Sequence, residues 1–306
     1  MSHKLSGMKP PVAAVVGQLA RDLVLSVAEV PEAGISADAI GRREQLGGKG
    51  ANQAVGLAQL GVRPRLVAVA GDDVIGDVLL DQARRDGIDV TAVVRRPGAL
   101  TGLIMELLDS DGKWRYVEHL SEAVLLTVGD VQRAQSVIGE ADAVLVQLQQ
   151  PAAAALAAAR IGHDAGSLVV LDGAPAEHRD ELLAAADVVR ADDREAELLL
   201  GGPATVAAAR RVLDQGPRLI ALAVPDGNLF VWPDGELQLP LTGDKVVDTT
   251  GGGDAFIAAL TASLLRGEDY PVAARWAVAA SAATVTHVSG RPDLTGLRIQ
   301  GPPHGS

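Results

Sequence analysis

Short apolar runs alternate with helical segments along most of this chain, and that alternation restricts the folds open to it. The apolar runs are bounded by turn-forming residues, as buried strands are, and lie at Val12–Val16, Arg65–Ala70, Ala143–Val146, Leu168–Leu171, Asp187–Val189 and Leu219–Val224. The helical segments between them, most of which stop at a glycine, are Ala51–Leu60, Val74–Asp86, Val128–Ile138, Pro151–Ala165 and Ala204–Gln215. This pattern predicts a mostly parallel sheet with helices on both faces, followed by two packed helices at Gly252–Arg266 and Tyr270–Val288.

Two stretches depart from the alternation and predict a second, smaller sheet. They contain β-type pieces, two of which flank a hairpin turn, at Leu23–Val27, Arg42–Leu46, Gly102–Leu108 and Lys113–Glu118. We therefore expect a β-sheet lid, built from segments at about 19–46 and 101–119, beside one α/β domain that spans residues 12–295. Residues 1–11 and 296–306 are expected to be tails.

Charge, cysteine content and hydropathy exclude several classes of protein. The 306 residues include 39 acidic and 27 basic side chains, a net charge of −12 that would repel a nucleic-acid backbone. The absence of cysteine excludes disulfides, thiolate nucleophiles and cysteine-bound metals. No apolar run reaches the ~18 residues of a membrane span, and Met1–Pro11 lacks the apolar core of a signal peptide. We expect a cytoplasmic protein that binds neither nucleic acid nor membranes.

The first of two glycine clusters lies at residues 47–54, with the sequence GGKGANQA. It differs from a P-loop, because Lys49 is followed by Gly50 rather than by Ser or Thr, and it lacks the third glycine of a dinucleotide-binding loop. Its glycines let the backbone approach a ligand closely, while Lys49 and Asn52 supply a cation and an amide at a helix start. The cluster is typical of a site for hydroxyl-rich or anionic ligands, or else of a tight turn with a solvated lysine.

The second cluster, DTTGGGDAF at residues 248–256, places three glycines directly before an apolar helix. The first N–H groups of that helix have no partner within it, and they point with the helix dipole at whatever lies in the loop. Asp254 follows the glycines in the first turn. It is either a plain helix cap or a base that takes a hydroxyl proton while the amides hold phosphate charge, as phosphoryl transfer requires.

Together the two clusters resemble the two signatures of the ribokinase/PfkB family of sugar and nucleoside kinases. They have the family's order and separation, and the resemblance extends from about Val12 to Asp293. It implies a ribokinase-like, Rossmann-type three-layer α/β/α domain with a small β-sheet lid. Such lids are often used for dimerisation, so we expect a homodimer formed through the lid. The resemblance also implies ATP-dependent phosphorylation of a primary hydroxyl on a sugar or nucleoside.

The resemblance assigns roles to individual residues. Asp254 matches the catalytic base, and the anion hole matches Gly251, Gly252 and Gly253. The substrate contacts correspond to Asp22, Gly48, Lys49, Asn52 and, in place of a family glutamate, Gln149. The ATP contacts correspond to Asp192, Ala223, Asp226, Gly227, Asn228 and Gly253.

Two kinds of metal ion are implied in the same way. Magnesium near the phosphates is organised in the family by an Asn-x-x-Glu motif, which here reads Asp192 to Glu195. Because magnesium keeps several of its waters, one glutamate nearby is chemically sufficient. A monovalent cation, expected to be K⁺, corresponds to Asp248, Thr250, Thr284, His287 and Ser289.

Departures from the family pattern point away from ribose as the substrate. Ala20 stands in place of an asparagine, residues 121–123 read Ser-Glu-Ala in place of Gly-Ala-Asn, and Gln149 replaces the glutamate. Pro225 removes an N–H donor from the nucleotide loop. We expect an active kinase whose acceptor is a modified sugar or a nucleoside. The alternative is a degenerate sensor that binds sugar or nucleotide without turnover. An NAD-dependent dehydrogenase is excluded, because the loop after the first strand lacks the glycine fingerprint.

Overall fold

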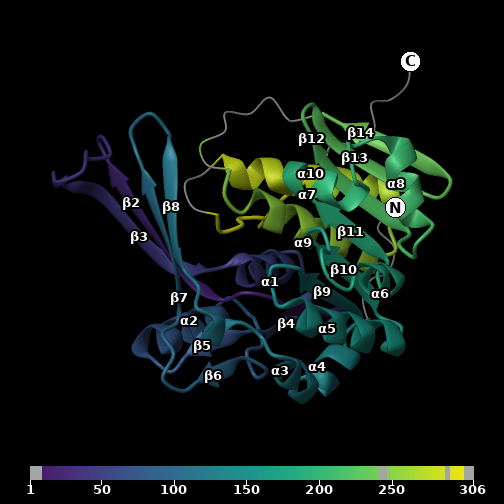
Figure 1. Cartoon of the computed structure of the whole chain (residues 1–306), viewed down its shortest axis with the longest axis horizontal. Coiled ribbons are helices and arrows are strands. Elements are labelled where there is room, and N and C mark those ends of the chain that lie inside the picture. Colours follow the sequence, from purple (N-terminus) through teal and green to yellow (C-terminus); the bar gives the residue numbers. More distant parts are fainter. Residues whose placement is uncertain (1–8, 241–246, 248, 287–289, 300–306) are drawn as a thin grey trace.

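The computed structural model describes residues 9–240, 247, 249–286 and 290–299 (Figure 1). Its main sheet has eight strands, in the order β14 (Gly235–Leu239), β13 (Gly227–Trp232), β12 (Leu219–Val224), β11 (Val188–Ala191), β10 (Leu168–Asp172), β9 (Ala143–Gln147), β1 (Val12–Val16) and β4 (Arg63–Val67). Neighbours from β12 to β4 are parallel, and the hairpin of β13 and β14 adds two antiparallel strands at one edge. The predicted mostly parallel sheet is confirmed.

Helices cover both faces of this sheet. Successive residues of a strand point to opposite faces, and in these strands the residues on both faces are apolar. Ala13 and Val15 pack with one set of helices: α1 (Lys49–Gln59), α2 (Val74–Arg85), α9 (Gly252–Leu265) and α10 (Tyr270–Val285). Ala14 and Val16 pack with the other set: α3 (Val128–Arg133), α4 (Gln135–Gly139), α5 (Ala152–Ala165), α6 (Arg179–Ala184), α7 (Asp193–Leu200) and α8 (Val206–Leu213). The result is the expected three-layer α/β/α arrangement, and α9 and α10 pack together as predicted.

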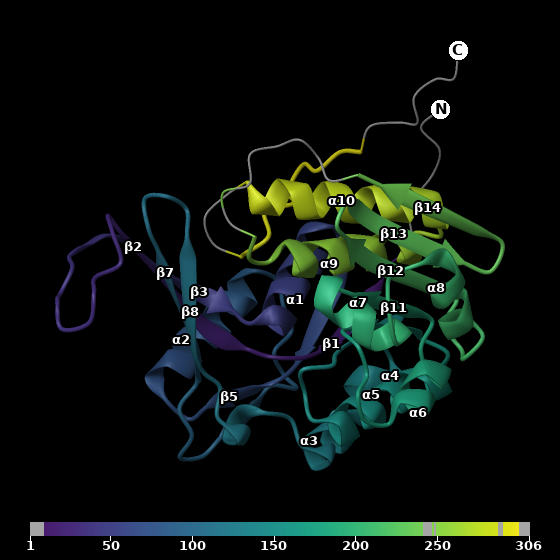
Figure 2. The same cartoon turned by 45° about the horizontal axis from the view of Figure 1, so that its top comes forward.

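The lid is a second sheet of four strands, in the order β3 (Ala39–Gly47), β2 (Ala20–Val27), β7 (Gly102–Leu108) and β8 (Trp114–His119). Its strands extend beyond the body of the molecule in both views (Figures 1 and 2). β2 follows directly from the carboxyl end of β1, which lies between β9 and β4 in the main sheet. The strand order of the sheet reverses at β1, and open parallel sheets bind ligands at the carboxyl ends of the strands at such a point. The predicted second sheet is confirmed, and it begins where a ligand site is expected.

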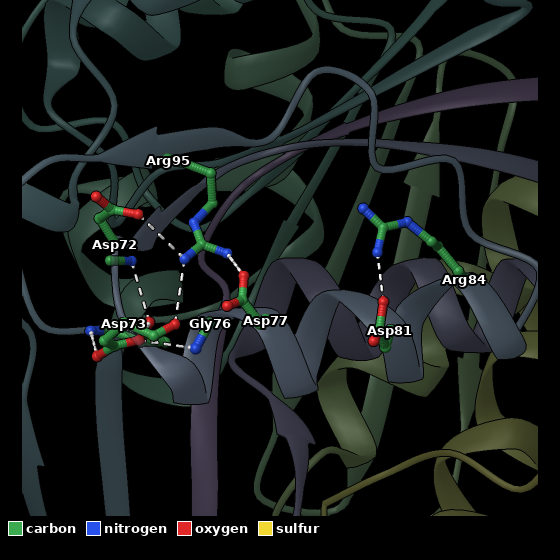
Figure 3. Close-up of polar contacts among 9 residues, drawn as sticks. Asp72, Asp73, Gly76, Asp77, Asp81, Arg84 and Arg95 are labelled. Carbon is green, nitrogen blue, oxygen red and sulfur yellow. Dashed lines mark hydrogen bonds and ion pairs between the residues drawn. The ribbon is translucent and has the colours of Figure 1, made fainter.

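Polar contacts fix the start of β7 to the body. Asp73 caps α2 by accepting from the Gly76 N–H at 2.7 Å. The same carboxylate accepts from the backbone and the hydroxyl of Thr101, at 2.8 and 2.6 Å. Arg95, on β6 (Val94–Arg96), holds this corner from the other side through the Asp73 carbonyl and Asp77 (Figure 3). The start of the lid strand is therefore hydrogen-bonded to the residue that caps α2.

The predicted strand Arg65–Ala70 is wrong as a single element. β4 ends at Val67, where its partner β1 has also ended, and the chain then pairs with β6 as a separate strand, β5 (Val69–Gly71). The predicted helix Val128–Ile138 is likewise two helices, divided at Ala134. A short 3₁₀ turn lies at Glu122–Val124. No helix among the described residues is long and apolar enough to cross a membrane.

Candidate active site

A cavity of about 280 Å³ lies between the lid and the body. The lid contributes side chains from β2, β7 and β8, and the body contributes the starts of α1 and α9. Its lining residues are Asp22, Val24, Gly48, Lys49, Asn52, Ile104, Glu106, Trp114, Tyr116, Glu118, Thr249, Thr250, Gly251, Asp254 and Gly290. Both glycine clusters of the sequence therefore meet at one hollow, although about 200 residues separate them.

Asp254 projects into this cavity from the first turn of α9. Gly251 is the N-cap residue of this helix, and no side chain caps it, so the interpretation of Asp254 as a plain cap is wrong. Its carboxylate instead accepts from the Asn52 amide at 3.2 Å and from the Gln53 amide at 3.3 Å. Asn52 and Gln53 both belong to α1, so the two glycine-led helices orient this carboxylate together.

Burial raises the pKa of Asp254 to about 7, and the neighbouring charge of Asp172 acts in the same direction. The ammonium group of Lys49 and the two amide hydrogen bonds oppose the rise. A carboxylate whose pKa lies near the working pH is both substantially ionised and basic enough to accept a proton. Asp254 is therefore suited to general base chemistry at neutral pH.

At two positions of this site a neighbouring group lies so close to the backbone that only glycine fits. A Cβ at Gly47 would lie 1.9 Å from the carboxyl carbon of Asp22, so the lack of a side chain there leaves space for that carboxylate. Gly251 has a φ of +71°, and a Cβ there would lie 1.7 Å from the Gly290 carbonyl oxygen. Side chains at these positions would displace the loops that shape the cavity.

Asp22 is the second buried carboxylate of the cavity, with 8% of its surface exposed. Burial raises its pKa to about 7, and the carboxylates of Asp254, Glu106 and Glu118 act in the same direction. A hydrogen bond from the Gly48 N–H opposes the rise. Its Oδ1 atom has no hydrogen-bond partner among the described residues.

A second cavity, of about 450 Å³, lies on the other side of the α9 N-terminus. It is lined by the β12–β13 hairpin, by Gly253 and by neighbouring residues: Arg190, Asp193, Ala223, Val224, Pro225, Gly227, Asn228, Phe256 and Ser281. Three of the predicted ATP contacts, Ala223, Gly227 and Asn228, are thus brought together beside Gly253. Asp226 occupies the two-residue turn with Pro225 and is not among the lining residues.

Arg190 is a partly buried cation of this second cavity that sequence reasoning missed. Its guanidinium donates to Asp172 at 3.1 Å, and a Cβ on Gly253 would lie 2.7 Å from its Nη2 atom. The positive charge therefore lies against the loop that begins α9. The sequence held one signal for it, an arginine near the end of an otherwise apolar strand.

Other predicted site residues lie elsewhere or are already engaged. Gln149 lines a separate hollow near α5, where it accepts from the Gln147 amide at 3.0 Å, so the structure does not bring it to the substrate cavity. Asp192 and Glu195 form a reciprocal capping box at the start of α7. Burial and the charge of Asp172 raise the pKa of Glu195, so a nearby cation would stabilise its ionised form.

The expected monovalent-cation site is only partly described. Asp248, His287 and Ser289 lie outside the described residues. The Thr250 hydroxyl bonds with the Tyr116 hydroxyl, and the Thr284 hydroxyl donates to the Ala280 carbonyl within its own helix. Among the described residues, no group of three or more acidic or histidine side chains could hold a metal ion.

Comparisons with known proteins agree with this geometry. The family model described as pfkB family carbohydrate kinase matches residues 12–295. The chain is 30% identical over 286 residues to a ribokinase of Haemophilus influenzae, which covers 89% of this chain and 91% of the relative. It is 33% identical over 279 residues to an ATP-dependent ribose-1-phosphate kinase of Halopiger xanaduensis, which covers 90% and 92%. A crystal structure of ribokinase from Thermotoga maritima matches with a TM-score of 0.76 and 26% identity, over 95% of this chain and 96% of that one. This chain belongs to the pfkB family of carbohydrate kinases.

Proposed function

We propose that this protein transfers the γ-phosphoryl group of ATP to a hydroxyl group of a sugar or nucleoside other than ribose. The observation that carries the proposal is the position of α9. Its N-terminus separates two cavities, and Asp254 faces the cavity under the lid while Gly253 faces the other. An acceptor under the lid and a nucleotide against the β12–β13 hairpin would then meet at this helix start.

Asp254 acts on the acceptor in this scheme. Its carboxylate takes the proton of the acceptor hydroxyl as that oxygen forms a bond to the γ-phosphorus, and the bond between phosphorus and the ADP oxygen breaks. Since the ionised form of Asp254 is the reactive one, kcat/KM should rise as the pH increases through about 7. A rate that stays constant between pH 6 and pH 8 would contradict this assignment.

The charge of the transferred group is stabilised from the α9 side. The N–H groups of the first turn have no partner within the helix, and the positive end of the helix dipole lies there. Arg190 adds a cation beside Gly253. Glu195, whose pKa is raised by burial and by Asp172, would hold magnesium through its waters. When bound, that ion neutralises phosphate charge.

The acceptor pocket supports a substrate other than ribose. Gln149, the residue at the place of a sugar-binding glutamate in the family, lies in a different hollow. Ala20 and residues 121–123 are absent from the lining of the substrate cavity as well. The charged side chains that line this pocket are instead Asp22, Lys49, Glu106, Glu118 and Asp254.

Release of ADP across a panel of sugars and nucleosides tests the proposal. We expect turnover with at least one acceptor and a lower kcat/KM for ribose than for that acceptor. Ribose emerging as the best acceptor would overturn the proposed specificity. Tight ATP binding without turnover on any acceptor would overturn the kinase function and favour the sensor.

A further inference from the structure

A buried carboxylate that the proposed reaction does not use lies at the carboxyl end of β10. This residue, Asp172, has a side chain that is 2% exposed, and it is among the described lining residues of neither cavity. Strand pairing places it opposite Arg190 of β11, whose guanidinium donates to the Asp172 Oδ1 atom at 3.1 Å. The other oxygen, Oδ2, accepts from the Gln53 side-chain amide at 2.8 Å. Asp172 therefore uses one oxygen for β11 and the other for α1.

Gln53 joins this carboxylate to Asp254. Its Nε2 atom donates to Asp172 at 2.8 Å and to Asp254 at 3.3 Å, and its side chain is fully buried. An ionised carboxylate only accepts hydrogen bonds, so the amide nitrogen of Gln53 must face the two carboxylates and its oxygen must face away. The Oε1 atom of Gln53 indeed has no partner among the described residues. The two carboxylates therefore fix the orientation of this amide.

These contacts form a continuous chain of hydrogen bonds from one cavity to the other. Its members are, in order, Arg190, Asp172, Gln53 and Asp254. Arg190 lines the cavity beside Gly253, and Asp254 lines the cavity under the lid. Electrostatic interactions are stronger in a buried network than in water, and a change in one member alters the hydrogen bonds of the next.

The charges that act on Asp254 come from four elements. Burial is the main cause of its raised pKa, the charge of Asp172 on β10 comes next, and Lys49 on α1 opposes both. Asp22 on β2 and Arg190 on β11 also interact with Asp254 through charge. Among these described groups, Asp172 is the one that shares a hydrogen-bond donor with Asp254. A change at position 172 therefore reaches Asp254 through a contact as well as through charge.

We infer that Asp172 is a positioning residue for phosphoryl transfer. It holds Gln53 against Asp254 on the acceptor side and Arg190 beside Gly253 on the nucleotide side. Because Asp172 lines neither cavity, it acts through these two neighbours rather than on a substrate. Its effect on the rate rests on the proposed kinase function, whereas the chain of hydrogen bonds is a property of the protein alone.

Steady-state kinetics of the full chain at pH 8, where Asp254 is mostly ionised, test the effect on the rate. Asp172→Asn leaves one acceptor oxygen where there were two, so Gln53 and Arg190 can no longer both donate as they do now. It should lower kcat about 10- to 100-fold, as misplacement of reacting groups does, with little change in the acceptor KM.

A second variant and a control complete the kinetic test. Gln53→Met removes the amide from an unbranched side chain and should lower kcat to a similar extent. The double variant should be no slower than the slower single variant, because both changes break the same link. Asp187→Asn is the matched control: this aspartate pairs with Arg218 at 3.0 Å at the amino end of β11, so kcat should not change. Wild-type kcat in both single variants, or multiplied losses in the double variant, overturns the inference.

The side-chain amide resonances of Gln53 test the chain of hydrogen bonds without turnover. In protein labelled with ¹⁵N-glutamine they are identified by their loss in Gln53→Met. Arg190→Lys, at the far end of the chain, should shift these resonances, and it should no longer do so when Asp172→Asn is also present. Resonances that do not move, or that move equally in both backgrounds, overturn the inference. The expected shifts in a protein that releases no ADP would instead count against the proposed kinase function.

Discussion

Replacement of Asp254 by asparagine should make the protein more stable while it removes activity. The carboxylate is buried against the charge of Asp172, and its pKa is raised from 3.8 to about 7. One pKa unit corresponds to 1.36 kcal/mol, so keeping this group ionised costs the folded state about 4 kcal/mol. An asparagine has a similar shape and avoids that cost.

The sign of the pH dependence follows from proton binding. Between about pH 4 and pH 7 the folded protein holds a proton on Asp254 that the unfolded chain has lost, so the stability of the wild type falls as the pH rises. Above pH 7 the folded state bears the full cost of ionising Asp254. At pH 5 the same two pKa values give a destabilisation of about 2 kcal/mol. The advantage of Asp254→Asn should therefore be about 4 kcal/mol at pH 8 and about half of that at pH 5.

Urea unfolding of both proteins at pH 5 and pH 8 measures these differences. Asp164→Asn, an exposed aspartate near the end of α5, is the matched control and should leave stability within about 0.5 kcal/mol at both pH values. If Asp254→Asn were less stable than the wild type at pH 8, or if its advantage were the same at both pH values, the assignment of a raised pKa to Asp254 would be refuted.

Three further substitutions test other parts of the account. Thr101→Val removes a buried hydroxyl that donates to Asp73 and accepts from the Gly71 N–H. The free energy of unfolding, measured in urea, should fall by about 2–4 kcal/mol. An unchanged free energy of unfolding would argue against a role of Thr101 in holding the start of β7. Gly47→Ala places a methyl group where the Asp22 carboxylate lies. The KM for the acceptor should rise at least about tenfold while the KM for ATP stays constant. Equal changes in the two KM values would contradict a specific effect on the acceptor cavity. Arg190→Lys keeps the positive charge but loses the planar guanidinium group that bonds to Asp172. Steady-state kcat/KM for ATP should fall about 10- to 100-fold, with little change in acceptor binding. Wild-type kinetics would show that Arg190 does not act on the nucleotide.

Much of the fold and the position of Asp254 could be predicted because they depend on local patterns. Glycines followed at once by an apolar helix identify the start of α9, and alternating apolar segments identify the parallel sheet. The hairpin turn between β7 and β8 identified the lid. Each of these signals lies within one short stretch of sequence.

The rest of the site depends on contacts between distant segments. Glu106 and Glu118 look like ordinary strand residues until the register of β2, β7 and β8 places them beside Asp22. Arg190 gains its position only because β10 and β11 pair and bring it to Asp172. Gln149 was assigned from a family position, but its side chain bonds to Gln147 instead. The break at Ala68 reflects where the partner strand ends, which the sequence of the broken segment does not encode.

The central claim, that Asp254 accepts the hydroxyl proton during phosphoryl transfer, is tested most directly by single-turnover kinetics. Rapid-quench assays with γ-labelled ATP and the best acceptor compare the transfer rate of the wild type with that of Asp254→Asn. The account predicts a transfer rate lower by about 10²- to 10⁴-fold, with the Kd for ATP unchanged. Transfer by Asp254→Asn within a factor of ten of the wild-type rate would contradict it.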